Sequence, residues 1–214
     1  MILLHATRDR RDGERAAPCR KGGFTLVELL VVIVIVVLLG VALAASPGLW
    51  RSKGMTTAGN QVMEDLAYAR ELAVSGNQPT ELWFLQPTGG TLFTGTQIYT
   101  IDENGAWSPY GGVHHLPANV GIDSGAALSS LFATANNTQK TWTSEAQAAI
   151  SGYGLNYNAY YIRFMPDGSI SQATQNYFIT LHDVALGNQL PKLPANYVVL
   201  NIDYVTGSVS MYRP

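Results

Sequence analysis

Residues 24–45, FTLVELLVVIVIVVLLGVALAA, decide the fold of this 214-residue chain. These 22 residues carry a single charge, on Glu28, and almost all of the others are apolar. A helix of this length covers about 33 Å, which is enough to cross a bilayer core of about 30 Å. We therefore expect residues 24–45 to form a transmembrane helix.

The charges are spread unevenly on the two sides of this segment. Residues 1–23 carry six Lys and Arg against three Asp and Glu, a net charge of +3, whereas residues 24–214 carry a net charge of −5. The positive-inside rule therefore places residues 1–23 in the cytoplasm and the long C-terminal part outside. The acidic body disfavours a general nucleic-acid-binding surface. The single cysteine, Cys19, excludes an intrachain disulfide and a Cys-rich zinc site.

Two simpler interpretations of the apolar segment are a secretory signal peptide and a plain N-terminal anchor. Residues 42–46 (ALAAS) could serve as a signal-peptide cleavage site, but the apolar core is long for a signal peptide. Neither interpretation explains Glu28, because a carboxylate at mid-bilayer costs about 2.5–3.5 kcal/mol and usually has a partner. The 20 residues after Glu28 contain no charge. We therefore expect the partner to come from another subunit.

Residues 21–30, KGGFTLVELL, carry a recognisable motif. A basic residue, a Gly, a Phe and a Glu at the fifth position after the Gly together resemble the class III signal of type IV prepilins and type II secretion pseudopilins. The resemblance implies that a prepilin peptidase cuts between Gly23 and Phe24 and removes residues 1–23 as a leader. It also implies N-methylation of Phe24 and a helix that stays as anchor and filament core.

The same resemblance supplies a partner for Glu28. In such filaments the carboxylate is expected to neutralise the new α-amino group of Phe24 on a neighbouring subunit. Two charges that are costly in a medium without water then become one compensated pair. The pair also sets the axial register between neighbouring helices.

Residues 46–78 are expected to continue the helix into the head. Ser46-Pro47-Gly48 predicts a kink or short break, because a proline inside a helix removes a hydrogen bond. A second helical segment follows at about residues 57–75, before Gly76-Asn77 and Pro79 end it. Its apolar residues fall at helical spacing, and they are Met55, Val62, Leu66, Ala69 and Ala73.

Residues 79–214 predict a β-rich globular head. Strand-forming runs lie at residues 80–86, 97–102, 106–110, 116–123, 159–165, 177–181, 197–203 and 208–212. Turn signals separate them at Asn104-Gly105, Pro166-Asp167-Gly168 and Thr206-Gly207. Residues 124–158 lack periodicity and predict a long insertion with a short helix near residues 124–134. We therefore expect an α+β fold, with a long N-terminal helix packed on an antiparallel sheet, and this arrangement resembles that of pilin-like proteins.

A finer resemblance rests on residues of the head. Asn60-Gln61, Ala69-Arg70, Ala73, residues 164–168 and Ile202-Asp203 with Gly207 are similar to the minor pseudopilin H and FimT-type group. The stretch 56–70 and the ending 207–214 look closest to pilin-like proteins called Verru_Chthon cassette protein D.

Other chemistry-bearing residues receive plainer interpretations. His114-His115 disfavours one metal site, because adjacent side chains of a strand point to opposite faces. Residues 102–105 (DENG) are interpreted as a turn, since no bidentate Glu follows as a calcium loop requires. His182-Asp183 is interpreted as a surface pair. We expect no catalytic site, no metal and no cofactor.

These observations predict a structural subunit, a minor pseudopilin of a type II secretion pseudopilus or a type IV pilus. It would cross the bacterial inner membrane once, with a cytoplasmic N-terminus and a periplasmic head, before entering the filament. Its expected partners are the prepilin peptidase, other pilin or pseudopilin subunits and the inner membrane. The alternative is a pilus-displayed binding protein such as a DNA-uptake receptor of the FimT type. Lys192 and Arg213 alone are too little charge near the C-terminus for a phosphate track.

Overall fold

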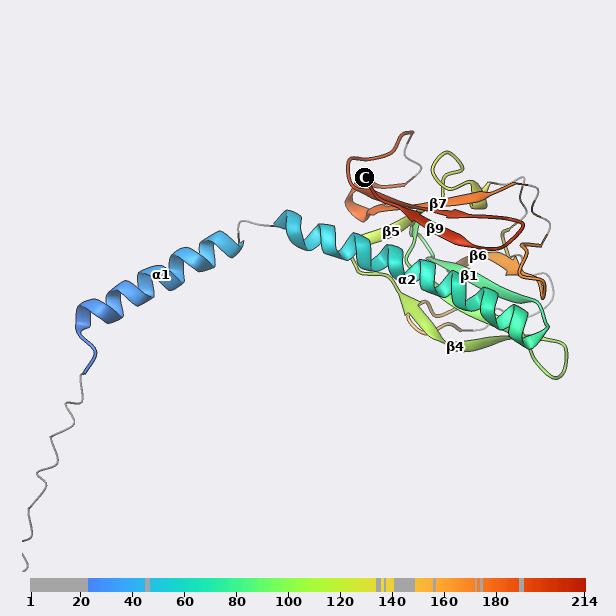
Figure 1. Ribbon diagram of the computed structural model, residues 1–214, viewed down its shortest axis with the longest axis horizontal. Coiled ribbons are helices and arrows are strands. Elements are labelled where there is room, and N and C mark those ends of the chain that lie inside the picture. Colours follow the sequence, from blue (N-terminus) through green and yellow to red (C-terminus); the bar gives the residue numbers. More distant parts are fainter. Residues whose placement is uncertain are drawn as a thin grey trace, which may run out of the picture. The chain divides into compact units, whose positions relative to one another are not determined.

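The computed structural model describes residues 23–44, 47–133, 136, 138–140, 149–155, 157–171, 173, 175–188 and 191–214. The leader predicted at residues 1–23 thus lies outside the described residues, apart from Gly23. The chain separates into two compact units, Met1–Ser46 and Pro47–Pro214, which are described one at a time (Figure 1).

The first unit contains helix α1 (Leu26–Ala44). Helical structure is confirmed over this range, whereas the membrane crossing expected of residues 24–45 stays a prediction. Each large apolar side chain from Leu26 to Val41 exposes between 48 and 82% of its surface. Among the described residues, no helix has both the length and the apolarity that a membrane crossing requires.

The second unit begins with helix α2 (Pro47–Gly76). The prediction that this helix starts near residue 57 is wrong, because it starts at Pro47. Proline is favoured at the first position of a helix, where its missing N–H would have no partner inside the helix. Of the residues predicted to interrupt the helix, Pro47 and Gly48 belong to α2, whereas Ser46 lies outside the described residues.

The end of α2 follows the prediction at Gly76-Asn77. Asn77 adopts a left-handed conformation with φ of 49°. The N–H of Gln78 donates to the carbonyl oxygen of Ala73 at 3.2 Å, and the N–H of Asn77 donates to that of Val74 at 3.4 Å. This pair of bonds is a Schellman motif, which satisfies two of the last carbonyl groups of the helix.

Two antiparallel sheets follow, with strand orders β4-β3-β1-β6 and β2-β5-β7-β8-β9. The strands are β1 (Thr80–Pro87), β2 (Leu92–Phe93), β3 (Gly95–Ile101), β4 (Trp107–His115), β5 (Val120–Asp123), β6 (Tyr157–Phe164), β7 (Tyr177–Asp183), β8 (Tyr197–Ile202) and β9 (Val209–Tyr212). All eight predicted strands are present, but β4 extends to His115 instead of ending at residue 110, and β5 starts at Val120 instead of residue 116. The two-residue strand β2 and the 3-10 turn η3 (Val184–Leu186) are not foreseen. The three predicted glycine turns are also confirmed, with positive φ at Gly105, Gly168 and Gly207.

Helix α2 lies along both sheets and closes the main core (Figure 1). The five apolar positions predicted on its buried side are all inaccessible to solvent, and they are Met55, Val62, Leu66, Ala69 and Ala73. They pack in one cluster with apolar residues of both sheets, including Phe84 and Leu200. The predicted α+β class, a helix on antiparallel sheets, is therefore confirmed.

The first sheet buries side chains on both of its faces. Along β1, Leu82 and Phe84 belong to the main core, whereas Trp83 and Leu85 belong to a separate cluster. This outer aromatic cluster consists of Trp83, Leu85, Tyr99, Ile150, Tyr157 and Ala159. Because successive side chains of a strand alternate between faces, the cluster lies on the face of the sheet turned away from the main core.

The prediction of a long insertion with a helix at residues 124–158 needs correction. The described part of this segment contains the 3-10 turn η1 (Ser130–Phe132), and β6 already begins at Tyr157. Leu131 and Phe132 pack in the main core. Their burial is set by tertiary contacts and leaves no periodic pattern in so short a turn. Residues 134–135, 137, 141–148 and 156 lie outside the described residues.

Candidate functional site

The start of α1 carries the motif singled out in the sequence. Gly23, Phe24 and Thr25 precede the helix, and Glu28 lies in its first turn. The hydroxyl oxygen of Thr25 accepts a hydrogen bond from the backbone N–H of Glu28 at 3.2 Å, as an N-cap residue does. The Gly23–Phe24 peptide bond is therefore outside the helical hydrogen-bond ladder.

The surroundings of this peptide bond are open within the described residues. The side chain of Phe24 exposes 78% of its surface, and a Cβ placed on Gly23 would meet no atom within 4 Å. A bulkier residue at position 23 would therefore fit the chain itself. The carboxylate of Glu28 lies at the positive end of the helix dipole and has no ion-pair partner among the described residues.

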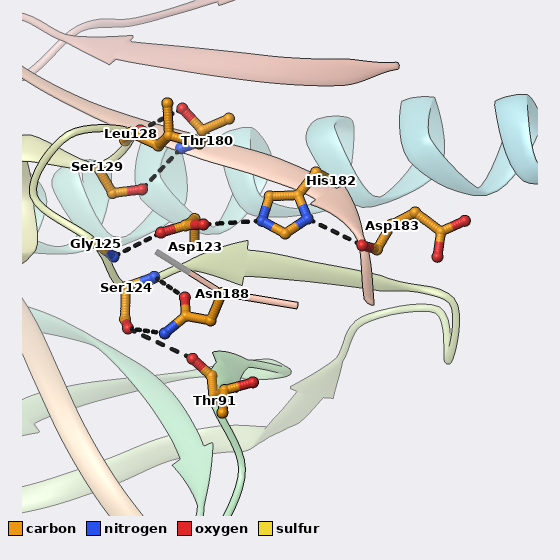
Figure 2. A network of polar contacts seen from close by, with 10 residues as sticks. All are labelled: Thr91, Asp123, Ser124, Gly125, Leu128, Ser129, Thr180, His182, Asp183 and Asn188. Carbon is orange, nitrogen blue, oxygen red and sulfur yellow. Dashed lines mark hydrogen bonds and ion pairs between the residues drawn. The ribbon is translucent and has the colours of Figure 1, made fainter. Parts of the chain in front are cut away.

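In the head, the structure corrects the interpretation of His182 as a surface residue. His182 and Asp123 are both fully buried, and His182 Nε2 lies 3.0 Å from Asp123 Oδ2 (Figure 2). His182 Nδ1 lies 3.0 Å from the carbonyl oxygen of Asp183. Both ring nitrogens of His182 therefore lie within hydrogen-bond distance of an oxygen atom.

This pair belongs to a network that fastens the segment after β5 to the sheet (Figure 2). Asp123 Oδ1 accepts a hydrogen bond from the N–H of Gly125 at 2.6 Å, and Ser129 Oγ accepts one from the N–H of Thr180 at 3.1 Å. The side chain of Asn188 bonds both the N–H and the hydroxyl of Ser124. Because Asp123 and His182 are inaccessible to solvent, the network is suited to holding structure rather than to catalysis on an outside substrate.

The two adjacent histidines are separated, as expected for a strand. His114 Nδ1 lies 2.6 Å from Oδ1 of the buried Asp65 on α2, whereas His115 stacks on Tyr153 with ring centroids 5.4 Å apart. In the part of the chain that the structure describes, no three His, Cys, Asp or Glu residues gather as a metal site.

The stretch 102–105 forms a closed turn. Asp102 Oδ1 accepts hydrogen bonds from the N–H groups of Asn104 and Ala106, both at 2.9 Å. This arrangement is an Asx-type turn, in which the aspartate side chain bonds the backbone of its own loop. The interpretation of these residues as a turn is confirmed.

Residues that carry the finer resemblance meet at one junction of the head. Arg70 on α2 donates from Nε to the carbonyl oxygen of Thr206 at 2.6 Å. A Cβ on Gly207 would lie 2.2 Å from the carbonyl oxygen of Gly168, so these two turns approach closely only because position 207 is a glycine. The residues of the finer resemblance therefore have a structural role, because they join α2 to the turns at Gly168 and Gly207.

Sequence reasoning missed a buried carboxylate in β1. Glu81 is fully buried and contacts Arg163 and Lys140. The available signal was a charge within the strand-forming run 80–86, since a buried charge requires partners.

Two family models match the chain. Residues 58–191 match the family described as type II transport protein GspH, and residues 19–44 match the prokaryotic N-terminal methylation motif. The first match covers more than half of the chain. The search of curated proteins found no match to the chain.

Solved structures with a similar arrangement include a minor pseudopilin EpsH from the type 2 secretion system of Vibrio cholerae. It is 9% identical with a TM-score of 0.42, and the alignment covers 77% of this chain and 98% of that one. The type IV minor pilin FimU of Pseudomonas aeruginosa is 14% identical with a TM-score of 0.43, over 75% of this chain and 92% of that one. The family assignment rests on the match at residues 58–191.

Proposed function

Because the chain belongs to the GspH family of type II transport proteins, it is a minor pseudopilin subunit of a type II secretion pseudopilus or a type IV pilus, and we propose that it matures by cleavage after Gly23. The observation that carries the cleavage proposal is the methylation motif at residues 19–44, whose Gly23–Phe24 bond precedes the first turn of α1. The prepilin peptidase would release residues 1–23, and Phe24 would then be N-methylated.

The methylation motif and the pilin-like family together imply a membrane-anchored subunit. In the proposal, residues 24–45 form the anchor in the bacterial inner membrane. The basic residues of the leader stay in the cytoplasm, and the head of residues 79–214 is periplasmic. After cleavage the same helix moves from the lipid into the filament with other pilin or pseudopilin subunits.

Glu28 and the new amino group of Phe24 are proposed to pair between neighbouring subunits. The support is chemical, because α1 has Glu28 as its only charged residue and all of its large apolar side chains up to Val41 are exposed. A carboxylate in such surroundings is tolerated when a cation neutralises it. Cleavage supplies that cation at the end of a neighbouring chain.

The family is one of structural subunits, and we infer no catalysis by this chain. The alternative of a DNA-uptake receptor stays a prediction, since Lys192 and Arg213 are far fewer cations than a phosphate track needs.

Replacement of Gly23 tests the cleavage step. We expect Gly23→Val to accumulate as the full-length precursor, because a side chain at this position would obstruct the peptidase while the chain itself has room for it. Mass spectrometry of the processed wild-type protein should give Phe24 as its first residue. Gly40→Ala is the matched control, since a Cβ at Gly40 also meets nothing within 4 Å and the position is remote from the cut. Normal processing of Gly23→Val, or a wild-type start at another residue, would contradict the proposal.

A further inference from the structure

The outer face of the first sheet holds a charged centre. The carboxylate of Glu81 accepts hydrogen bonds from Arg163 Nε at 3.0 Å and Arg163 Nη2 at 2.5 Å, both on Oε1. Its other oxygen, Oε2, accepts from Trp83 Nε1 at 2.7 Å and from Lys140 Nζ at 3.4 Å. One buried anion therefore faces two cations.

The excess charge of this centre resides on Lys140. Arg163 forms two short bonds to Glu81 and neutralises it as a charge-assisted pair. Lys140 forms one long bond, and Glu81 is its single hydrogen-bond acceptor among the described residues. An ammonium group has three N–H donors, so two of them have no oxygen partner there.

Aromatic rings hold the ammonium group of Lys140 in place. Its Nζ lies 5.0 Å from the ring centroid of Trp83, 5.7 Å from that of Trp107 and 5.4 Å from that of Tyr161. These are distances for cation–π attraction. The side chain of Lys140 is 21% exposed, so the cation is mostly withdrawn from water and yet accessible.

A cleft of about 580 Å³ lies beside this ammonium group. Lys140 is the one charged residue that lines it, and the walls include three aromatic side chains, Trp83, Tyr99 and Trp107. Asn104, Gln97 and Ser151 add polar groups to the lining. The volume falls within the range of about 300–1,000 Å³ that is typical of small-molecule sites.

We propose that this cleft binds a small organic acid, with its carboxylate on Lys140 and a planar apolar body against the aromatic wall. The ammonium group selects an anion, because among the described residues two of its donors have no oxygen partner and its one carboxylate partner, Glu81, is already neutralised by Arg163. The aromatic wall selects a flat apolar body, which buries area against the rings. Lys140 would repel a cationic ligand. A neutral ligand would bind more weakly than an anion, because it could not pair with the charge of the ammonium group.

The probe for this site is 3-phenylpropanoate, compared with 3-phenylpropanamide, which has the same body without the charge. The full-length protein in detergent micelles is titrated with each compound by calorimetry and by ligand-observed NMR. We expect saturable binding of the acid, at least tenfold tighter than binding of the amide, that weakens as salt is raised.

Lys140→Met removes the charge and keeps an apolar stem, while Arg163 continues to neutralise Glu81. We expect this variant to lose at least tenfold in affinity for the acid and to bind acid and amide alike. Lys192→Met, which removes an exposed lysine elsewhere, is the matched control. Trp107→Leu keeps Glu81, Lys140 and Arg163 but removes one of the rings that the two cations contact. This variant should weaken both compounds, and it covers the case that Lys140→Met fails to fold. Absence of saturable binding to the wild type, equal affinity for acid and amide, or full affinity in a folded Lys140→Met would overturn the proposal. None of these outcomes depends on cleavage at Gly23.

Discussion

Helix α1 exposes 48–82% of each large apolar side chain up to Val41, whereas α2 buries Met55, Val62 and Leu66 completely. The buried side of α2 repeats at helical spacing and meets both sheets of the head. The partners of α2 are thus encoded in the same chain. α1 has apolar residues on every side, and in the proposed function its partners are lipid and then other subunits. Substitutions in the two helices should therefore affect different measurements.

The largest effect is expected from Glu28 on α1. Glu28→Ala should leave cleavage nearly unchanged but reduce incorporation into filaments at least tenfold, because breaking a buried charge pair costs about 3–5 kcal/mol. The measurement is the amount of processed subunit in sheared filaments, quantified on gels. Glu28→Gln, which keeps the shape and removes the charge, should behave in the same way. Wild-type incorporation of both variants would refute the pairing.

The next largest effect is expected on α2, where it concerns the stability of the head. Leu66→Ala should lower the free energy of unfolding of the head by about 2–5 kcal/mol, because it leaves a cavity in the main core. Denaturant titration in micelles provides the measurement. Leu38→Ala on α1 is the control, since this side chain is 64% exposed and its loss should change head stability by less than about 0.5 kcal/mol. Equal losses of unfolding free energy in Leu66→Ala and Leu38→Ala would contradict the view that only α2 stabilises the head.

The smallest effect is expected at the turn between β8 and β9. The backbone N–H and the hydroxyl of Thr206 both donate hydrogen bonds to the carboxylate of Asp203. These bonds, the backbone one most strongly, hold the pKa of Asp203 below its ordinary value. A lowered folded-state pKa means that Asp203 stabilises the head above its unfolded pKa, and that this contribution is lost as pH falls through the folded pKa. Asp203→Asn should therefore be slightly less stable than wild type at neutral pH and equal to it in strong acid. Thermal unfolding across acidic pH measures the difference, and a gap that widens toward low pH would exclude this assignment.

Local features of the fold could be predicted from the sequence. The apolar run of α1, the spacing of Val62, Leu66 and Ala69, and the glycine turns at Gly105 and Gly207 each depend on neighbouring residues. The motif around Gly23 is local too, so the family could be predicted from a short stretch.

Features that depend on residues distant in the sequence could not be predicted. Proline at position 47 fits either a break or a helix start, and only the packing of α2 decides between them. His182 pairs with Asp123, which lies 59 residues earlier, so its burial has no local signature. Leu131 and Phe132 enter the core from a turn without periodicity.

The all-round apolarity of α1 also bears on symmetry. A helix with one apolar face can pack against a neighbour only through that face. The helix α1 has exposed apolar side chains on all of its faces, so it can pack in any rotation about its own axis. Neighbours can then approach it from all sides at once, as the central column of a bundle requires. In the proposed pairing, Glu28 would then set the axial position of each helix, whereas the apolar surface would leave its rotation open.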